Sequence, residues 1–302
     1  MVIGIDMGGT STKYGLVRDD GSVVARGSIP TGGTLDEYVD LLCRSVSGLV
    51  LSNGLKKTDA VGMGCPNGNY HTGCIEHAVN LPWKGVVPIA RMVSERIGAP
   101  CAITNDANAA ALGEMRYGAT RGISDFIMVT LGTGVGGGIV TGGRLLYGHD
   151  GFAGELGHVI VERNGRLCGC GRRGCLEAYC SATGVSRSAR ERTGREMTSK
   201  QVFQAAVNGE KWAQEIFSQT GALLGRTLAD FVAVTSPEAI VIAGGLSRAG
   251  ELLLQPVRKA MDESLLPMWK GKIRILSSAL PSDDAAVLGA ASLALEIRHP
   301  LD

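Results

Sequence analysis

Three cysteines and one histidine lie close together in the sequence, in the pattern His-x9-Cys-x-Cys-x4-Cys. The histidine is His158, and the cysteines are Cys168, Cys170 and Cys175. Three thiolates and one imidazole fill the tetrahedral coordination sphere of zinc, so this set predicts a structural zinc with no open position for chemistry. The alternative is four unrelated reduced side chains. Three of the eight cysteines of the chain fall within eight positions, which favours the metal site.

Two carboxylates flank this cluster. Glu155 precedes His158, and Glu177 follows Cys175 by two residues. A metal-bound loop would fix the direction of Glu177, and a fixed carboxylate is a good acceptor for the hydroxyl groups of a sugar. As ordinary surface charges these glutamates would need no such support. We therefore expect them beside a sugar site.

Two glycine-rich turns each follow an apolar strand, one after Val2–Asp6 and one after Phe126–Leu131. Glycine lets the backbone approach a phosphate group, and the N–H groups of such a turn face the anion. A strand follows each turn, so neither is a Walker A loop or a Rossmann fingerprint. A plain hairpin also favours glycine, and each turn alone is a weak signal. Together they predict a clamp on the phosphates of one nucleotide.

A third glycine pair, Gly244-Gly245, ends the apolar strand Ala239–Ile242, where backbone could lie flat against a base or ribose. For this pair alone, a plain strand–turn–helix junction is the simpler explanation. The nucleotide-binding residues predicted from the three motifs are Asp6, Gly8, Gly9, Thr10, Ser11, Lys13, Gly132, Thr133, Gly134, Gly244 and Gly245.

Asp106 follows the strand Ala99–Thr104 and precedes the alanine-rich helix Ala107–Tyr117. An aspartate at a helix start is ordinarily an N-cap. A carboxylate at the C-terminal end of a strand in an open α/β sheet is also placed where ligands bind. Phosphoryl transfer to a hydroxyl is helped by a base within reach of that hydroxyl. We therefore predict that Asp106 is a catalytic base and that Asp6 holds Mg²⁺ through water.

The elements that position these residues alternate between helices and short apolar strands, which predicts an α/β fold. The chain opens with an antiparallel meander, and its second half repeats the strand–glycine turn–strand plan of the first. Further helices are expected over residues 35–51, 86–97, 198–234 and 285–297. With 302 residues the chain is long for one core. We expect a small domain of residues 1–118 plus 285–302 and a large one of residues 119–284 that carries the zinc loop.

The composition excludes several classes of function. Lys plus Arg is 30 and Asp plus Glu is 29, so no basic field attracts nucleic acid or an anionic membrane. Aromatic residues make up 5%, which leaves little for base stacking. No apolar stretch approaches the roughly 20 residues that span a bilayer. No signal peptide is visible, so we expect a reducing cytoplasmic location, where clustered cysteines are more often metal ligands than disulfides.

Taken together, these motifs resemble those of the ROK family of sugar kinases and repressors, over essentially the whole chain. Asp6-x-Gly8-Gly9-Thr10 and Leu131-Gly132-Thr133-Gly134 are similar to its two phosphate motifs, and Gly244-Gly245 to its adenosine motif. The most specific match is Glu155-Leu156-Gly157-His158 with Cys168-x-Cys170-Gly171-x2-Gly174-Cys175-Leu176-Glu177. The resemblance implies a two-domain actin-like ATPase (ribonuclease H-like) fold, with a nucleotide and sugar cleft between the domains.

The resemblance also implies an enzyme that transfers a phosphoryl group from ATP to the 6-hydroxyl of a hexose, glucose first of all. Asp106 would be the base toward that hydroxyl, and His158 would contact the sugar while it ligates zinc. The sugar-binding residues that the resemblance implies are Asn80, Asn105, Asp106, Glu155, His158 and Glu177. One departure is Gly64-Cys65-Pro66-Asn67-Gly68, where the family has Gly-x-Pro-Gly; this insertion of Asn67 bears on sugar specificity.

Several alternatives stay open at this point. A kinase for N-acetylglucosamine or N-acetylmannosamine would use the same residues, and only the room near O2 of the sugar would distinguish it. A non-catalytic sugar sensor is disfavoured by Asp106 and the two glycine turns, and a chaperone-like ATPase would not need the zinc site. Repressors of the family carry an N-terminal winged helix, for which the first strand at residue 2 leaves no room. By resemblance we expect a homodimer that uses ATP, Mg²⁺ and a structural Zn²⁺.

Overall fold

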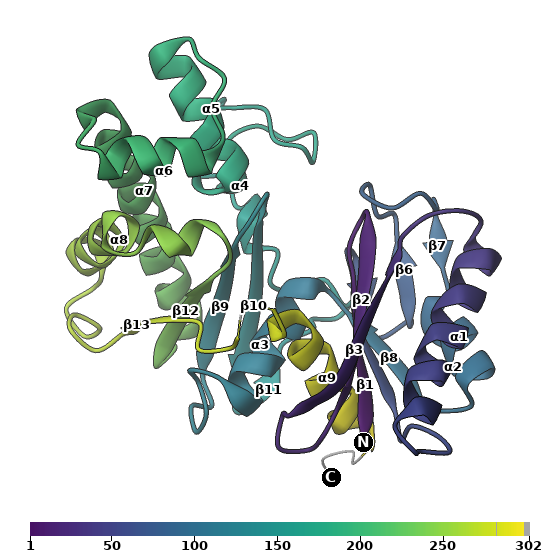
Figure 1. Cartoon of the computed structure of the whole chain (residues 1–302). Coiled ribbons are helices and arrows are strands. Elements are labelled where there is room, and N and C mark those ends of the chain that lie inside the picture. The colour runs from purple at the N-terminus through teal and green to yellow at the C-terminus, as the bar shows by residue number, and fades with distance from the viewer. Residues whose placement is uncertain (282, 299–302) are drawn as a thin grey trace. The chain divides into compact units, whose positions relative to one another are not determined.

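The computed structural model describes residues 1–281 and 283–298 (Figure 1). The chain forms two compact units. Unit 1 comprises Met1–Gly122, Leu145–Ala153 and Ala279–Asp302, and unit 2 comprises Ile123–Arg144 and Gly154–Ser278. The domain boundaries and the cleft expected from the sequence stay predictions, and residues 299–302 of the expected small domain lie outside the described residues.

The sheet of unit 1 has the strand order β3-β2-β1-β4-β8. Its first three strands form the predicted antiparallel meander, while β4 and β8 run parallel to β1. The strands are β1 (Val2–Met7), β2 (Ser11–Val17), β3 (Val23–Pro30), β4 (Val61–Gly64) and β8 (Cys101–Thr104). Side chains alternate along β1, so Ile3 and Ile5 enter one core while Val2 enters another.

Two pairs of helices pack on this sheet. They are α1 (Leu35–Ser52) with α2 (Ile89–Ile97), and α3 (Asp106–Tyr117) with α9 (Ala285–Arg298). A capping box formed by Thr34 and Glu37 starts α1. The helix expected from residue 86 begins only at Ile89, because Val86–Val87 form strand β7 and Pro88 is the N-cap. β7 pairs in a small second sheet with β6 (Cys74–Glu76), which also pairs with β5 (Gly68–Asn69).

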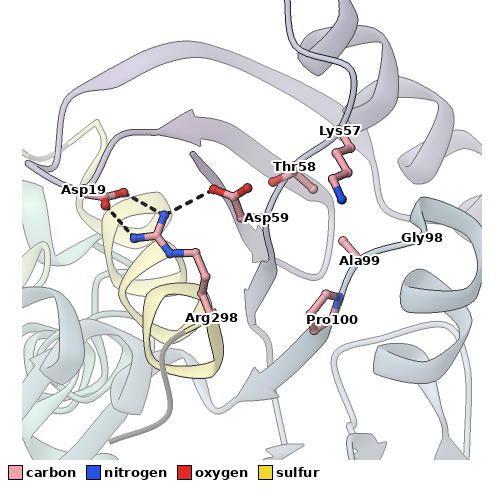
Figure 2. Close-up of a pocket in the computed structure, with 8 residues that line it drawn as sticks. All are labelled: Asp19, Lys57, Thr58, Asp59, Gly98, Ala99, Pro100 and Arg298. Atoms are coloured by element: carbon pink, nitrogen blue, oxygen red, sulfur yellow. Dashed lines mark hydrogen bonds and ion pairs between the residues drawn. The ribbon is translucent and has the colours of Figure 1, made fainter.

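Helix α9 lies directly against the backbone of β1 and β4. A Cβ atom at Gly62 would overlap the carbonyl oxygen of Ala290, and one at Gly4 would overlap that of Val287. Glycine is required at both positions because no side chain fits between the helix and the sheet. At the other end of α9, Arg298 forms ion pairs with Asp19 and Asp59 beside an open cavity (Figure 2). These contacts fix the last turn of the helix to the sheet.

The sheet of unit 2 repeats the plan of the first, with the order β11-β10-β9-β12-β13. β9 pairs antiparallel with β10, to which the second glycine turn connects it, and parallel with β12. β12 in turn pairs parallel with β13. Its strands are β9 (Phe126–Leu131), β10 (Val135–Thr141), β11 (Arg144–Leu145), β12 (Ala239–Ala243) and β13 (Arg274–Ser277). The predicted repeat of strand, glycine turn and strand is therefore present in both units.

Helices cover one core of unit 2, which is formed largely by apolar residues of β9, β12, α7 and α8. The helices are α4 (Glu177–Cys180), α5 (Ala182–Thr193), α6 (Ser199–Val207), α7 (Lys211–Thr235) and α8 (Glu251–Ser264), with the 3₁₀ turns η1 (Leu156–His158) and η2 (Leu246–Ala249). The helix expected over 198–234 is two helices, because the chain turns at Gly209, whose φ is +91°. No helix within the described part of the chain has the length and apolar character needed to cross a membrane.

Candidate active site

The four predicted metal ligands come together in unit 2. The ligating atoms of His158, Cys168, Cys170 and Cys175 all lie within 4.8 Å of one another. We call residues 158–175 the metal-cluster loop. It returns on itself through a bridge between Leu167 and Arg173. The grouping has the spacing that one tetrahedral ion with sulfur and nitrogen ligands requires.

The two nitrogens of His158 face different partners. Nδ1 lies 3.8 Å from Sγ of Cys168, inside the cluster. Nε2 lies 3.9 Å from Oε2 of Glu155 and therefore points out of the cluster. One imidazole can thus bind a metal through one nitrogen and hydrogen-bond a ligand through the other, which is the double role expected of this residue.

Glu177 connects the metal-cluster loop to the second glycine turn. Its Oε2 accepts a hydrogen bond from the Val135 N–H at 3.0 Å, and its Oε1 accepts from Sγ of Cys168 at 3.4 Å. Gly134 leaves the space for this carboxylate, because a Cβ there would overlap Oε2. The Val135 N–H orients Glu177 whether or not a metal is bound, whereas the contact with Cys168 requires that thiol to be protonated.

A cavity of about 570 Å³ in unit 2 borders the second glycine turn and Gly245. That volume is in the range of small-molecule sites. Its lining residues are Gly132, Thr133, Ala182, Ser199, Lys200, Phe203, Phe217, Gly245, Leu246, Arg248 and Ala249. Two aromatic rings with Leu246 form an apolar wall, and Lys200 and Arg248 add positive charge. This combination suits a flat aromatic base attached to phosphates.

One of the predicted glycines, Gly244, has a structural part instead. Gly244 has φ +94°, and a Cβ there would overlap the backbone of Leu131, so it shapes the end of β12 and is absent from the residues that line the cavity. Lys200, Phe203 and Arg248 were not predicted. For Lys200 and Phe203, the available sequence signal was the capping box of Thr198 and Gln201, which places both residues in the first turns of α6.

The first glycine turn in unit 1 carries the other predicted phosphate residues. The N–H of Gly8 donates to Ser11 O at 3.0 Å, which closes the hairpin, and Thr10, Ser11 and Lys13 follow along the turn and β2. A Cβ at Gly9 would lie 2.7 Å from the backbone oxygen of Asn80. The predicted sugar residue Asn80 therefore lies against the predicted phosphate turn.

Two carboxylates of unit 1 with a raised pKa, Asp6 and Asp106, lie at the ends of β1 and β8. Burial raises the pKa of Asp106, while its hydrogen bond from the Ala107 N–H opposes that shift. Burial also raises the pKa of Asp6, the charge of Asp106 raises it further, and Lys13 lowers it. A carboxylate with a raised pKa is a stronger base than a solvent-exposed one.

Asn105 takes the capping role that an aspartate at a helix start would otherwise have. Its Oδ1 accepts from the Ala107 N–H at 2.8 Å and caps α3, so Asp106 is the first residue within the helix. Asn67 of the inserted loop has φ +52° and donates through Nδ2 to Glu76 O at 2.9 Å. Its side chain is therefore bound to β6.

The predicted residues thus fall into two groups. Unit 1 holds the first glycine turn with Asp6, Asn80, Asn105 and Asp106. Unit 2 holds the second glycine turn, Gly244-Gly245, Glu155, Glu177 and the metal cluster.

A fold made of two sheets of the same plan, each with a glycine hairpin, is the two-domain actin-like ATPase fold, which solved structures of ROK sugar kinases share. The chain belongs to the ROK family, which it matches over residues 2–297. The glucokinase of Thermotoga maritima is 38% identical over 313 residues, with 98% of this chain and 97% of that protein covered. The N-acetylmannosamine kinase of Escherichia coli O157:H7 is 32% identical over 305 residues and covers 97% of each chain. A crystal structure of a ROK family glucokinase from Streptomyces griseus, in complex with glucose and AMPPNP, is 35% identical, covers 98% of this chain and 99% of its own, and has a TM-score of 0.82.

Proposed function

We propose that this protein is an ATP-dependent glucokinase, which transfers the γ-phosphoryl group of ATP to the 6-hydroxyl of glucose. The observation that carries the proposal is the similarity to glucokinases over 98% of the chain. The cavity between the second glycine turn and Gly245 supports the nucleotide part, because it combines an apolar wall with two cations. The use of ATP favours a cytoplasmic location.

Asp106 is the proposed base. Its burial raises its pKa and strengthens it as an acceptor for the proton of the 6-hydroxyl. Because Asn105 already caps α3, the carboxylate of Asp106 is available to the substrate. Asp6 would hold Mg²⁺ through water, and the ion would supply positive charge to the phosphates.

The remaining sugar hydroxyls are assigned to side chains that other contacts orient. Glu177 is fixed by the Val135 N–H, and His158 presents Nε2 on the side of Glu155. Asn80 and Asn105 complete the proposed set. Such orientation before binding reduces the entropy that is lost when the sugar is held in place.

Zinc is the proposed occupant of the metal cluster. Three sulfur donors and one imidazole nitrogen within 4.8 Å of one another suit its tetrahedral preference. The ion would close the metal-cluster loop and keep Glu177 and His158 in place. We also propose a homodimer, on family resemblance alone; light scattering during size-exclusion chromatography would measure the mass directly.

Steady-state kinetics with MgATP test the proposed substrate. The panel is glucose, N-acetylglucosamine, N-acetylmannosamine, mannose, fructose and allose. We expect the highest kcat/KM with glucose. A higher value with N-acetylmannosamine would favour the second candidate, which the 32% identity to a kinase of that sugar supports. Absence of phosphorylation of every sugar would refute the kinase assignment.

A further inference from the structure

The start of α5 holds the carbonyl groups of the second glycine turn. The Ala182 N–H donates to Gly132 O at 2.8 Å, and Oγ1 of Thr183 donates to Thr133 O at 2.9 Å. In a planar trans peptide group the C=O and the N–H point in opposite directions. Fixing these two carbonyls toward α5 therefore directs the N–H groups of Thr133 and Gly134 to the opposite side, where a phosphate can accept from them.

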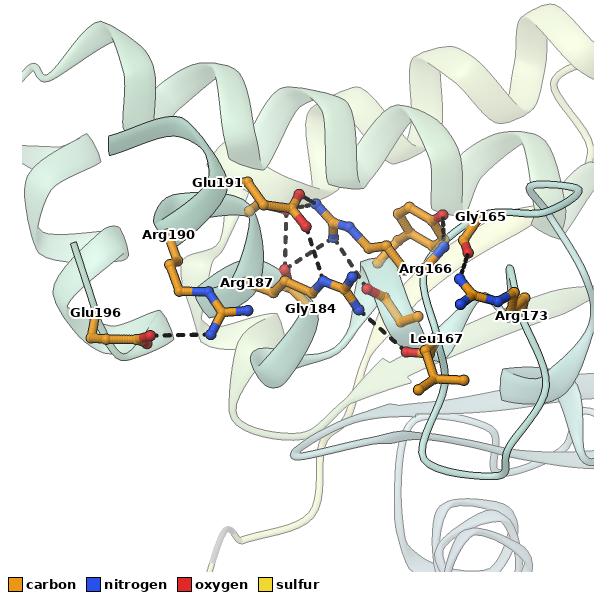
Figure 3. A network of polar contacts seen from close by, with 12 residues as sticks. Gly165, Arg166, Leu167, Arg173, Gly184, Arg187, Arg190, Glu191 and Glu196 are labelled. Atoms are coloured by element: carbon orange, nitrogen blue, oxygen red, sulfur yellow. Dashed lines mark hydrogen bonds and ion pairs between the residues drawn. The ribbon is translucent and has the colours of Figure 1, made fainter. Parts of the chain in front are cut away.

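The position of α5 is itself fixed from two directions. Ser181 caps the helix by accepting from the Gly184 N–H at 3.0 Å. Arg166, in the metal-cluster loop, donates to Gly184 O at 3.3 Å (Figure 3). It also lies over the Tyr179 ring, with its guanidinium carbon 4.7 Å from the ring centre. The metal-cluster loop is thereby joined through α5 to the glycine turn.

Arg166 is well placed for this connection because most of its donors are used. Besides Gly184, it donates to Ala178 O at 3.1 Å and to Oγ of Ser188 at 3.0 Å. It also forms an ion pair with Glu191 (Figure 3). Its side chain is only 15% exposed. Several directed hydrogen bonds from one planar group restrict α5 more than a single flexible contact would.

We propose that Thr183 is a positioning residue for nucleotide binding. Its hydroxyl orients the peptide group between Thr133 and Gly134 so that the Gly134 N–H faces the phosphates of ATP. The inference rests on the proposed kinase function, which assigns the phosphates to this turn. The bond from Ala182 uses backbone and survives substitution, whereas Thr183 is exposed and its hydroxyl can be removed without disturbing a core.

The test compares Thr183→Val, Thr183→Ser and Thr193→Val in the full chain. Thr193 lies on the same helix. Its hydroxyl donates to Ala189 O and accepts from the Arg195 N–H, both away from the second glycine turn, so it controls for loss of a threonine hydroxyl from α5. Calorimetry measures the Kd of the ATP analogue AMPPNP with Mg²⁺ and, without nucleotide, the Kd of glucose. Steady-state kinetics at saturating glucose measure the KM for ATP.

In Thr183→Val, we expect the Kd of the analogue and the KM for ATP to rise about 3- to 10-fold, the range that one hydrogen bond controls. The Kd of glucose should stay within about 2-fold by the same argument. Thr183→Ser should restore wild-type values, and Thr193→Val should match wild type. Unchanged nucleotide affinity in Thr183→Val, or an equal loss of glucose affinity, would overturn the positioning role. A wild type that binds the analogue without phosphorylating sugar would instead refute the proposed function and leave the calorimetric comparison valid.

Discussion

Replacing Asp106 with asparagine separates its chemical role from its structural one. The substitution keeps the shape of the side chain and an oxygen that can accept from the Ala107 N–H, and α3 keeps its cap at Asn105. It also removes a negative charge that raises the pKa of Asp6. The fold should therefore be retained, and Tm should stay equal or increase.

The expected loss lies in the chemical step. General-base catalysis contributes about 10²- to 10⁴-fold, so kcat should fall at least 100-fold in Asp106→Asn. That factor corresponds to about 3 kcal/mol in the activation free energy. The Kd of glucose should change little, since the amide oxygen still accepts a hydrogen bond from the sugar.

Coupled-enzyme kinetics measure kcat, and calorimetry measures glucose binding. Asp36→Asn is a matched control, because Asp36 is also an aspartate in the first turn of a helix but its side chain is 79% exposed and pairs with Arg96. This control should keep wild-type kcat. A kcat within 10-fold of wild type in Asp106→Asn would refute the assignment of the base.

Three further predictions concern stability. Cys170→Ser should lower both the zinc content, measured by atomic emission, and Tm; a zinc-free variant with unchanged Tm and activity would contradict the structural role. Burial raises the pKa of Glu296 to about 7, so the free energy of unfolding should fall by about 2–3 kcal/mol as pH rises from 4.5 to 7. Urea titrations of Glu296→Gln at several pH values should not show that fall. If wild type and variant had parallel pH profiles of stability, Glu296 would not be the cause. Gly62→Ala should destabilise the protein by about 1–3 kcal/mol, because its Cβ would overlap the Ala290 carbonyl. Gly48→Ala in α1, where the space at Cβ is open, should stabilise it by up to about 1 kcal/mol. If chemical denaturation gave both changes in stability the same sign, the packing argument would be contradicted.

The predictable part of the fold consists of elements with a strong local pattern. Val2–Met7 and Phe126–Leu131 are apolar strands bounded by glycine, and Leu35–Ser52 has helical spacing of apolar residues after a capping box, so these elements were predicted to within a few residues. Strands β5, β6 and β7 were not predicted, because a strand of two or three residues is too short to show a hydrophobic period.

The membership of residues 145–153 in unit 1 has no local signal either. It depends on contacts distant in sequence, such as Nδ2 of Asn69 to Asp150 O at 2.7 Å and the stacked rings of Tyr70 and Tyr147 at 4.1 Å.

Site residues were predictable where their chemistry is tied to short spacing. The metal ligands span 18 positions, and their grouping in space follows the prediction from the sequence. The position of Phe203 and Lys200 in the cavity was not predicted, because both have the pattern of ordinary helix residues. They border the cavity because α6 approaches the second glycine turn and Gly245. Tertiary placement of a helix is not encoded in its own periodicity.

The close packing of α9 on β1 and β4 has a consequence for the order of events during synthesis. The ribosome produces the strands of this sheet early, yet the helix that covers one face is made after the whole of unit 2. At about 5–20 residues per second, the delay is on the order of ten to thirty seconds. During that time Gly4 and Gly62 leave a bare strip of backbone and apolar side chains on the nascent chain. This strip stays uncovered until the last helix has been made.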